Sequence, residues 1–218
     1  MINRTGKYDP FFFWALGLFL GLGLIWLLPW RFQTNDDVMM MWLVSGAYTG
    51  DFEPYAVFIH PWLSWIFSRL YSLSPEINWY GLTWFGVNLF SGYRLLKKIW
   101  TSPFPLIQKH FWSLFISLIS FHFGFFPQFT LIAGYAALAG LMQVFGSTSR
   151  RDMALGYLAF FLGISIRWES VVLISLGWLW AAIIFPQVRG SFYLPKLLGL
   201  FFLSVFLFSI IKLNIKNN

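Results

Sequence analysis

Long, nearly uninterrupted runs of apolar residues are the feature of this sequence that most restricts its fold. The first run, at 10–30, reads PFFFWALGLFLGLGLIWLLPW and contains no acidic or basic side chain. It matches the roughly 20 residues that cross a bilayer as a helix. Charged residues make up only 11% of the chain, against about a quarter in soluble domains. The sequence therefore predicts an integral membrane protein.

The remaining apolar runs predict several membrane crossings. Their hydrophobicity is continuous and lacks the two-residue alternation of barrel strands, which indicates helices. They lie at 55–74, 79–96, 106–126, 128–147, 153–167, 168–186 and 191–213. We expect residues 1–218 to form a single all-α domain, a polytopic transmembrane helix bundle of about seven or eight segments.

Basic residues gather in the connections between these runs. They lie at 94–109, at 150–151 and at 189–196, and two apolar segments separate each group from the next. Cytoplasmic loops of membrane proteins carry an excess of lysine and arginine, so all three connections are predicted to face the cytoplasm. Arg4 and Lys7 predict the same side for the N-terminus. This spread of charge fits membrane orientation better than a nucleic-acid surface, and we expect no nucleic-acid partner.

An acidic stretch at 33–54 would then lie outside the cytoplasm, which conflicts with the number of crossings predicted after it. An odd number of crossings must link it to the basic connection at 94–109, yet 55–74 and 79–96 supply two. We expect 55–74 to be interfacial or re-entrant, because it is interrupted by Pro54, His60, Pro61 and Arg69. In the alternative, the N-terminus is outside and the acidic stretch is cytoplasmic.

The acidic stretch reads QTNDDVMMMWLVSGAYTGDFEP and holds half of the chain's eight carboxylates. Thr34 and Asp37 match a capping box, with Thr34 as the N-cap, ahead of an apolar segment. A short amphipathic juxtamembrane helix is therefore expected after the first span, from about residue 37 to 49, ending at Gly50. The cap accounts for Asp37 but not for Asp36. Adjacent carboxylates can supply a general base or ligands for a divalent cation.

Four short stretches carry a resemblance to a known family. They are Asn35-Asp36-Asp37, Ile59-His60-Pro61-Trp62, Pro127-Gln128-Phe129-Thr130 and Ile166-Arg167-Trp168-Glu169. By these stretches and their places between the helices, the chain resembles the GT-C superfamily of membrane glycosyltransferases, including bacterial members from surface-polysaccharide clusters. The resemblance implies a multi-pass protein of the bacterial plasma membrane. Such a protein transfers a sugar from a polyprenyl-phosphate carrier to a glycan or lipid acceptor at the extracytoplasmic face. Family members are usually much longer, so the chain would be a truncated form or an N-terminal module.

The resemblance also implies roles for individual residues. Asp36, or Asp37 if the cap is misassigned, would be the general base of an inverting transfer. The two aspartates would hold a divalent cation, Mg²⁺ or Mn²⁺, if one is required, although some members have a further acid where Gln128 stands. Arg167 offers a planar fork of donors to the carrier phosphate. The other expected substrate-binding residues are His60, Gln128, Thr130 and Glu169.

Two simpler interpretations stay open. Arg167 and Glu169 would form an ion pair that only closes a tight turn. The whole chain would be a non-catalytic membrane component, such as a transporter or flippase subunit for lipid-linked sugars. That function needs polar residues along the helices, and Asn88, Gln128 and Gln143 are few. The sequence contains no motif of ATP binding, zinc proteolysis or serine hydrolysis.

Overall fold

The computed structural model describes residues 9–184, together with 196, 199–200 and 204. Within these residues every regular element is a helix, which confirms the all-α prediction. The helices are α1 (Pro10–Leu27), α2 (Asn35–Val44), α3 (Pro61–Leu73), α4 (Trp79–Trp100), α5 (Leu106–Phe125), α6 (Phe129–Gly146), α7 (Arg150–Ile166) and α8 (Trp168–Ile184). The apolar segment expected at 191–213 lies, apart from four positions, outside the described residues.

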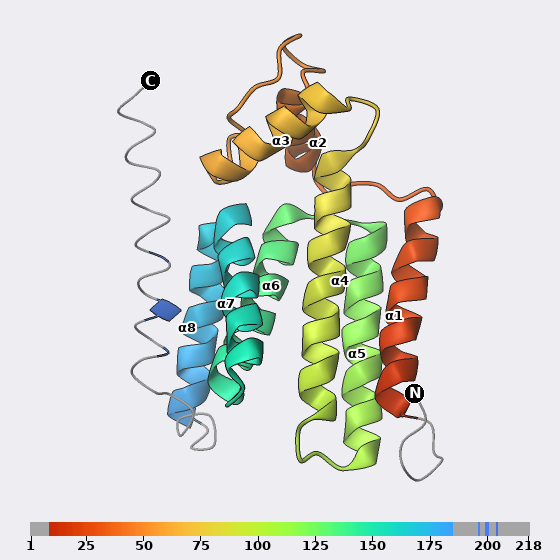
Figure 1. The fold of residues 1–218 in the computed structure, drawn as a ribbon, viewed down its shortest axis with the longest axis vertical. Coiled ribbons are helices and arrows are strands. Elements are labelled where there is room, and N and C mark those ends of the chain that lie inside the picture. Colours follow the sequence, from red (N-terminus) through yellow and green to blue (C-terminus); the bar gives the residue numbers. More distant parts are fainter. Residues whose placement is uncertain (1–8, 185–195, 197–198, 201–203, 205–218) are drawn as a thin grey trace.

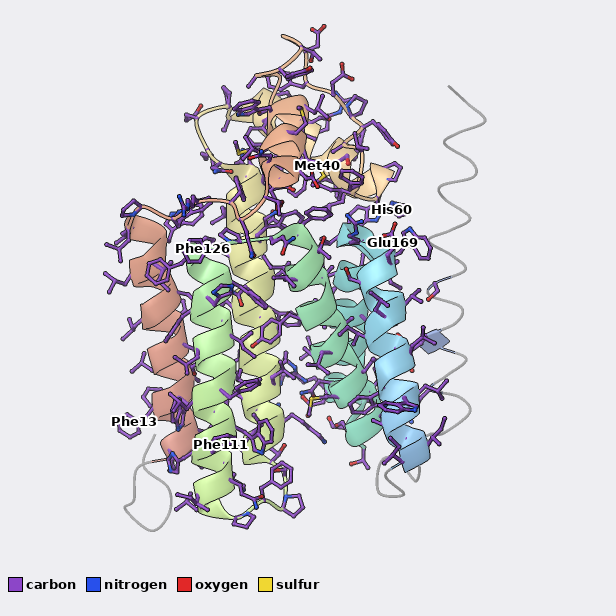
Figure 2. All side chains as sticks on the ribbon, turned by 180° about the vertical axis from the view of Figure 1, so that it is seen from behind. Phe13, Met40, His60, Phe111, Phe126 and Glu169 are labelled. Atoms are coloured by element: carbon purple, nitrogen blue, oxygen red, sulfur yellow. The ribbon has the colours of Figure 1, made fainter. Side chains whose placement is uncertain are left out.

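The long helices α1 and α4 to α8 run side by side, and α2 and α3 lie together across one end of them (Figure 1). Helix α6 packs against α4, α7 and α8, and α5 packs against α1 and α4. Phe13 and Phe111 lie towards the end of the bundle opposite to Met40 and His60 (Figure 2). The molecule therefore has two distinct ends, one covered by α2 and α3 and one made of helix termini and connections.

Helices α6 and α7 approach closely because small residues face each other across their contact. A side-chain carbon added at Gly140 would lie 2.8 Å from the backbone oxygen of Gly156, and one added at Gly163 would lie 2.9 Å from that of Ala133. Small residues at helix interfaces permit such close backbone packing, in membranes as in water. The glycines thus bring the first turn of α6 and the end of α7 together.

Helix α3 has 13 residues and is about 20 Å long, which is too short to cross a bilayer core of about 30 Å. It lies beside α2, and α4 then returns along the bundle from that end (Figure 1). Segment 55–74 therefore does not run the length of the bundle, whereas 79–96 does so as part of α4.

Helix α2 differs from the expected juxtamembrane helix, because it begins at Asn35 and ends at Val44. The prediction that it continues to 49 and stops at Gly50 is wrong. Gly46 adopts a φ of 74° and its N–H donates to the carbonyl of Leu43 at 3.3 Å, which ends the helix a turn earlier.

Two of the described helices, α1 and α6, are long and apolar enough to cross a membrane, and α8 is a shorter apolar helix. The two differ in setting, since 17% of the apolar window of α1 is buried and 67% of that of α6. By this measure fewer helices qualify than the sequence pattern predicted.

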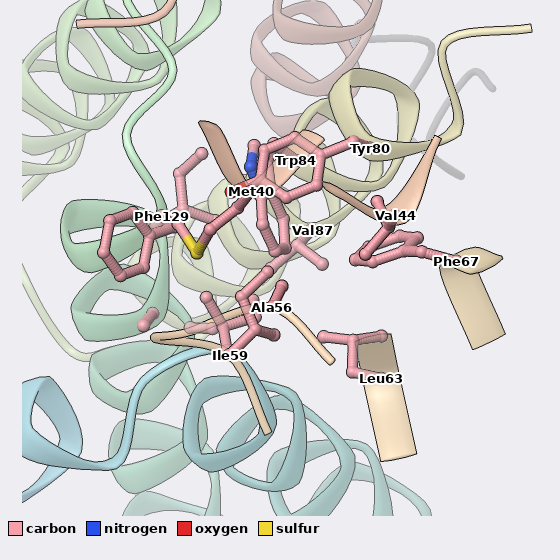
Figure 3. Packing of buried hydrophobic residues seen from close by; sticks show 14 of the residues in the cluster. Met40, Val44, Ala56, Ile59, Leu63, Phe67, Tyr80, Trp84, Val87 and Phe129 are labelled. Atoms are coloured by element: carbon pink, nitrogen blue, oxygen red, sulfur yellow. The ribbon is translucent and has the colours of Figure 1, made fainter. Parts of the chain in front are cut away.

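A hydrophobic core fastens α2 and α3 to the bundle. It joins Met40 and Val44 of α2, Phe67 of α3, Trp84 of α4 and Phe129 of α6, each at most 1% exposed (Figure 3). Burial of large side chains contributes about 1.5–3 kcal/mol each, so α2 and α3 form part of the same folded unit as the helices beneath them.

Candidate active site

All the site residues expected from the sequence lie at the end of the bundle that α2 and α3 cover. Asp36 and Asp37 are in the first turn of α2, and His60 precedes α3. The others lie at the start of α6 and in the turn between α7 and α8: Gln128, Thr130, Arg167 and Glu169. Figure 2 shows that His60 and Glu169 both lie at this end. The structure thus gathers residues that are far apart in the chain.

Asp37 is completely buried and accepts hydrogen bonds from three parts of the chain. The Tyr80 hydroxyl donates to Oδ1 at 2.9 Å, and the Thr34 hydroxyl donates to Oδ2 at 3.0 Å. The backbone N–H of Phe129 faces both oxygens, at 3.3 and 3.4 Å. Burial raises the pKa of Asp37 to about 6, and the hydrogen bonds from Tyr80 and Thr34 limit that rise.

The contact with Phe129 explains why a carboxylate is buried here. Phe129 is the first residue of α6, whose N-cap residue Gln128 makes no side-chain capping bond. The first N–H groups of a helix lack intrahelical acceptors, and a negative charge is favourable there. Asp37 therefore caps α6 from another helix.

The capping box expected at the start of α2 is only partly present. Thr34 is the N-cap residue, as predicted, but its side chain makes no bond to the backbone of α2. It donates instead to Asp37, whose oxygens point towards α4 and α6. Asp37 therefore accepts hydrogen bonds from α4 and α6 instead of from the backbone of its own helix.

Asp36 differs from its neighbour because it is exposed. Successive residues of a helix point about 100° apart, so one carboxylate faces the core and the other faces outwards. Since donors already occupy both oxygens of Asp37, the two aspartates do not fit a shared divalent cation. Among the residues that the structure describes, no group of three or more potential ligands could hold a metal ion. Asp36 is the carboxylate that an external hydroxyl could reach.

Arg167, the residue between α7 and α8, lies against two aromatic rings. Its guanidinium carbon is 4.9 Å from the ring centre of Phe129 and 5.3 Å from that of Phe58. Its Nε lies 3.6 Å from Glu169 Oε2, and a quarter of the Arg167 side chain is exposed. Such cation–π contacts contribute about 0.5–2 kcal/mol and hold the guanidinium in place without removing its charge.

Phe129 is thus shared by the two halves of the site. Its N–H binds Asp37, and its ring supports Arg167. The sequence indicated the turn that contains Phe129 but gave this residue no role, and it gave none to Phe58 or Tyr80. No local pattern identifies them, because each acts through a contact with a distant element.

The other predicted residues have structural contacts at the same end. His60 is 8% exposed. Its ring Nδ1 accepts the backbone N–H of Trp62 at 3.3 Å, and its backbone N–H donates to the carbonyl of Ser165 at 3.1 Å. His60 therefore caps α3 and ties it to α7. Gln128 and Thr130 are half-buried at the start of α6. The Glu169 side chain is 48% exposed.

Comparisons of this chain with protein-family models, with curated proteins and with solved structures find no match.

Proposed function

We propose that this chain is a multi-pass protein in which α1 and α4 to α8 cross a membrane while α2 and α3 rest at one surface. The distribution of side chains supports this setting. Leu27 of α1, Ile107 of α5 and Leu173 of α8 are 80, 78 and 70% exposed. Many other large apolar side chains on these helices are exposed as well. Asn88 and Arg94, in contrast, are buried. Lipid suits an apolar exterior of this extent, and water does not.

The direction of the helices supports the same proposal. Because α3 stays at one end, the connection at 100–106 and the start of α7 both lie at the opposite end (Figure 1). That end carries Lys97, Lys98, Lys109, Arg150 and Arg151. An excess of basic residues marks the cytoplasmic side, so α2 and α3 would be extracytoplasmic. In this arrangement α4 alone crosses between the acidic stretch and the basic connection, so the number of crossings agrees with the orientation.

At the extracytoplasmic end we assign the transfer of a sugar from a polyprenyl-phosphate carrier to a hydroxyl of a glycan or lipid acceptor. The observation that carries this assignment is the double contact of Phe129. Its N–H holds Asp37, which fixes the turn that presents Asp36, and its ring holds Arg167. A base and a phosphate ligand are therefore supported by one residue at one end of the bundle.

In the proposed reaction Asp36 accepts the proton of the acceptor hydroxyl. The oxygen attacks the anomeric carbon, and the bond from that carbon to the carrier phosphate breaks with inversion of configuration. The electron pair of that bond leaves with the phosphate. Arg167 stabilises the negative charge that grows there. Asp37 is a positioning residue in this scheme.

The test compares two asparagine variants in membranes supplied with labelled polyprenyl-phosphate sugars. Asp36→Asn should lower transfer by about 10²–10⁴-fold, the usual contribution of a general base, while protein amount and thermal stability stay unchanged. Asp51→Asn, an exposed carboxylate in the following loop, is the matched control and should keep full activity. Equal activity of Asp36→Asn and Asp51→Asn would overturn the assignment of Asp36.

A second candidate function, movement of a lipid-linked sugar without chemistry, is favoured by one observation. Within the described part of the bundle, buried polar atoms without a hydrogen-bond partner include Asn88 Oδ1, Ser91 Oγ and Ser117 Oγ. They belong to α4 and α5 and provide more polar groups along the bundle than the sequence suggested. An Asn88→Leu variant that stops translocation of a labelled carrier in vesicles, with Asp36→Asn fully active in the same assay, would favour this candidate.

A further inference from the structure

An open pocket of about 280 Å³ lies at the end of the bundle opposite to α2 and α3. It is formed where α4 and α6 end and α7 begins. The groups that matter for its chemistry come from Lys97, Lys98, Thr101, Thr148 and Asp152. Cationic and hydroxyl groups therefore line the same space.

Among the described residues, one carboxylate lines this pocket, and two cations already share it. Asp152 Oδ1 accepts from Arg94 Nη2 at 2.8 Å and from Lys97 Nζ at 2.9 Å. Arg94 is 2% exposed, and its Nε has no hydrogen-bond partner among the described residues. One negative charge thus faces two positive charges before any further lysine is counted.

Two more lysines converge beside the pocket. Lys98 Nζ donates to the carbonyl of Gly146, and Lys196 Nζ donates to the carbonyls of Phe145 and Ser147 at 3.5 and 3.1 Å. Within the described residues neither lysine forms an ion pair with a carboxylate. The carbonyl end of α6 supplies only about half a negative charge. The ammonium groups of Lys98 and Lys196 bind carbonyls of three consecutive residues and therefore repel each other. A bound anion would relieve this repulsion.

The start of α7 adds uncharged donors to this cationic surface. Ser149 is the N-cap of α7, and the first N–H groups of a helix lack intrahelical acceptors and can donate to an anion at that end. Thr101 and Thr148 add hydroxyl groups. Lysines, hydroxyls and helix N–H groups are the donors that bind phosphate in proteins.

We propose that this pocket binds a phosphate group, carried either by the headgroup of an anionic lipid or by a free phosphate ion. In the membrane setting proposed above, the pocket lies at the cytoplasmic ends of α4, α6 and α7, at the level of lipid headgroups. The proposal does not depend on sugar transfer at the other end.

The experiment uses the full chain in phosphatidylcholine nanodiscs. One arm titrates inorganic phosphate against chloride at constant ionic strength, and the other replaces part of the phosphatidylcholine by phosphatidic acid. Binding is measured as the rise in thermal unfolding temperature and, for lipid, by native mass spectrometry. Stabilisation in the phosphate arm identifies a free phosphate ligand, and stabilisation by phosphatidic acid alone identifies a lipid headgroup. Stabilisation in neither arm overturns the proposal.

Variants separate this pocket from general basic charge. Lys98→Gln should weaken binding about tenfold, the loss expected for one charge-assisted hydrogen bond. Lys109→Gln is the matched control, because Lys109 lies at the same end but donates to the Trp100 carbonyl and does not line the pocket. Equal losses in the two variants would overturn the proposal. If Lys98→Gln does not fold, Thr148→Val keeps all charges, and its binding must fall below that of Lys109→Gln.

Discussion

The two ends of the bundle each place an aspartate near the start of a helix, in opposite environments. Asp37 reaches the first residue of α6 from another helix, is completely buried and is held by neutral donors. Asp152 lies in the first turn of α7, is 21% exposed in its side chain and is held by Arg94 and Lys97. Burial without a cation disfavours the charged form, whereas paired cations favour it. The same residue type thus serves as an anchor at one end and as a counter-ion at the other.

The largest effect is expected from removing the counter-ion of Arg94. Asp152→Leu leaves a buried guanidinium without a carboxylate and should lower the free energy of unfolding by about 3–5 kcal/mol, measured by denaturant titration in micelles. Adding Arg94→Met should recover much of that loss, because a pair replaced by apolar groups leaves no isolated charge. If the double variant is as unstable as the single one, the pairing is not what stabilises this end.

The second effect concerns pH. Burial raises the pKa of Asp37 from its usual 3.8 to about 6, so between these values the folded chain holds a proton that the unfolded chain releases. Stability from this group therefore falls as the pH rises from about 4 to about 6 and stays low above that range. We expect the difference in unfolding free energy between wild type and Asp37→Asn to be about 3 kcal/mol more favourable to wild type at pH 4 than at pH 7. A pH-independent difference would contradict the raised pKa that burial gives Asp37.

A smaller effect is expected at the hydroxyl that holds Asp37. Tyr80→Phe removes the 2.9 Å donor from a buried carboxylate and should destabilise the protein by about 1–3 kcal/mol. The loss should shrink when Asp37→Asn is already present, which a double-mutant cycle measures. Additive losses would show that Tyr80 acts through packing alone.

The smallest effect belongs to the exposed partner of the opposite end. Lys97 is 36% exposed in its side chain, and Lys97→Gln should change the unfolding free energy by about 0–1 kcal/mol, because solvent screens the pair. Added salt should remove even this difference. A loss comparable to that of Asp152→Leu would mean that the ion pairs of Asp152 with Lys97 and with Arg94 stabilise the protein equally.

Much of the helical fold followed from the continuous apolar runs and the polar breaks between them. The segments expected at 106–126, 128–147 and 168–186 correspond closely to α5, α6 and α8. The predicted end of α2 was wrong because Gly46 and Gly50 both permit a left-handed turn. Only the surrounding contacts decide which of the two ends the helix. The sequence identified Asp36, Asp37 and Arg167 as unusual. It could not predict which of the two aspartates is buried, because burial depends on where α4 and α6 pass.

The sequence by itself determined the helical class and the segregation of charge, because continuous apolar runs and their polar breaks act locally along the chain. Only the tertiary structure decided that α3 stays at one end, that Asp37 caps α6 and that Phe129 joins Asp37 to Arg167. Those contacts link residues far apart in the chain. Their partners are selected by how the helices pack, and local sequence carries no record of it.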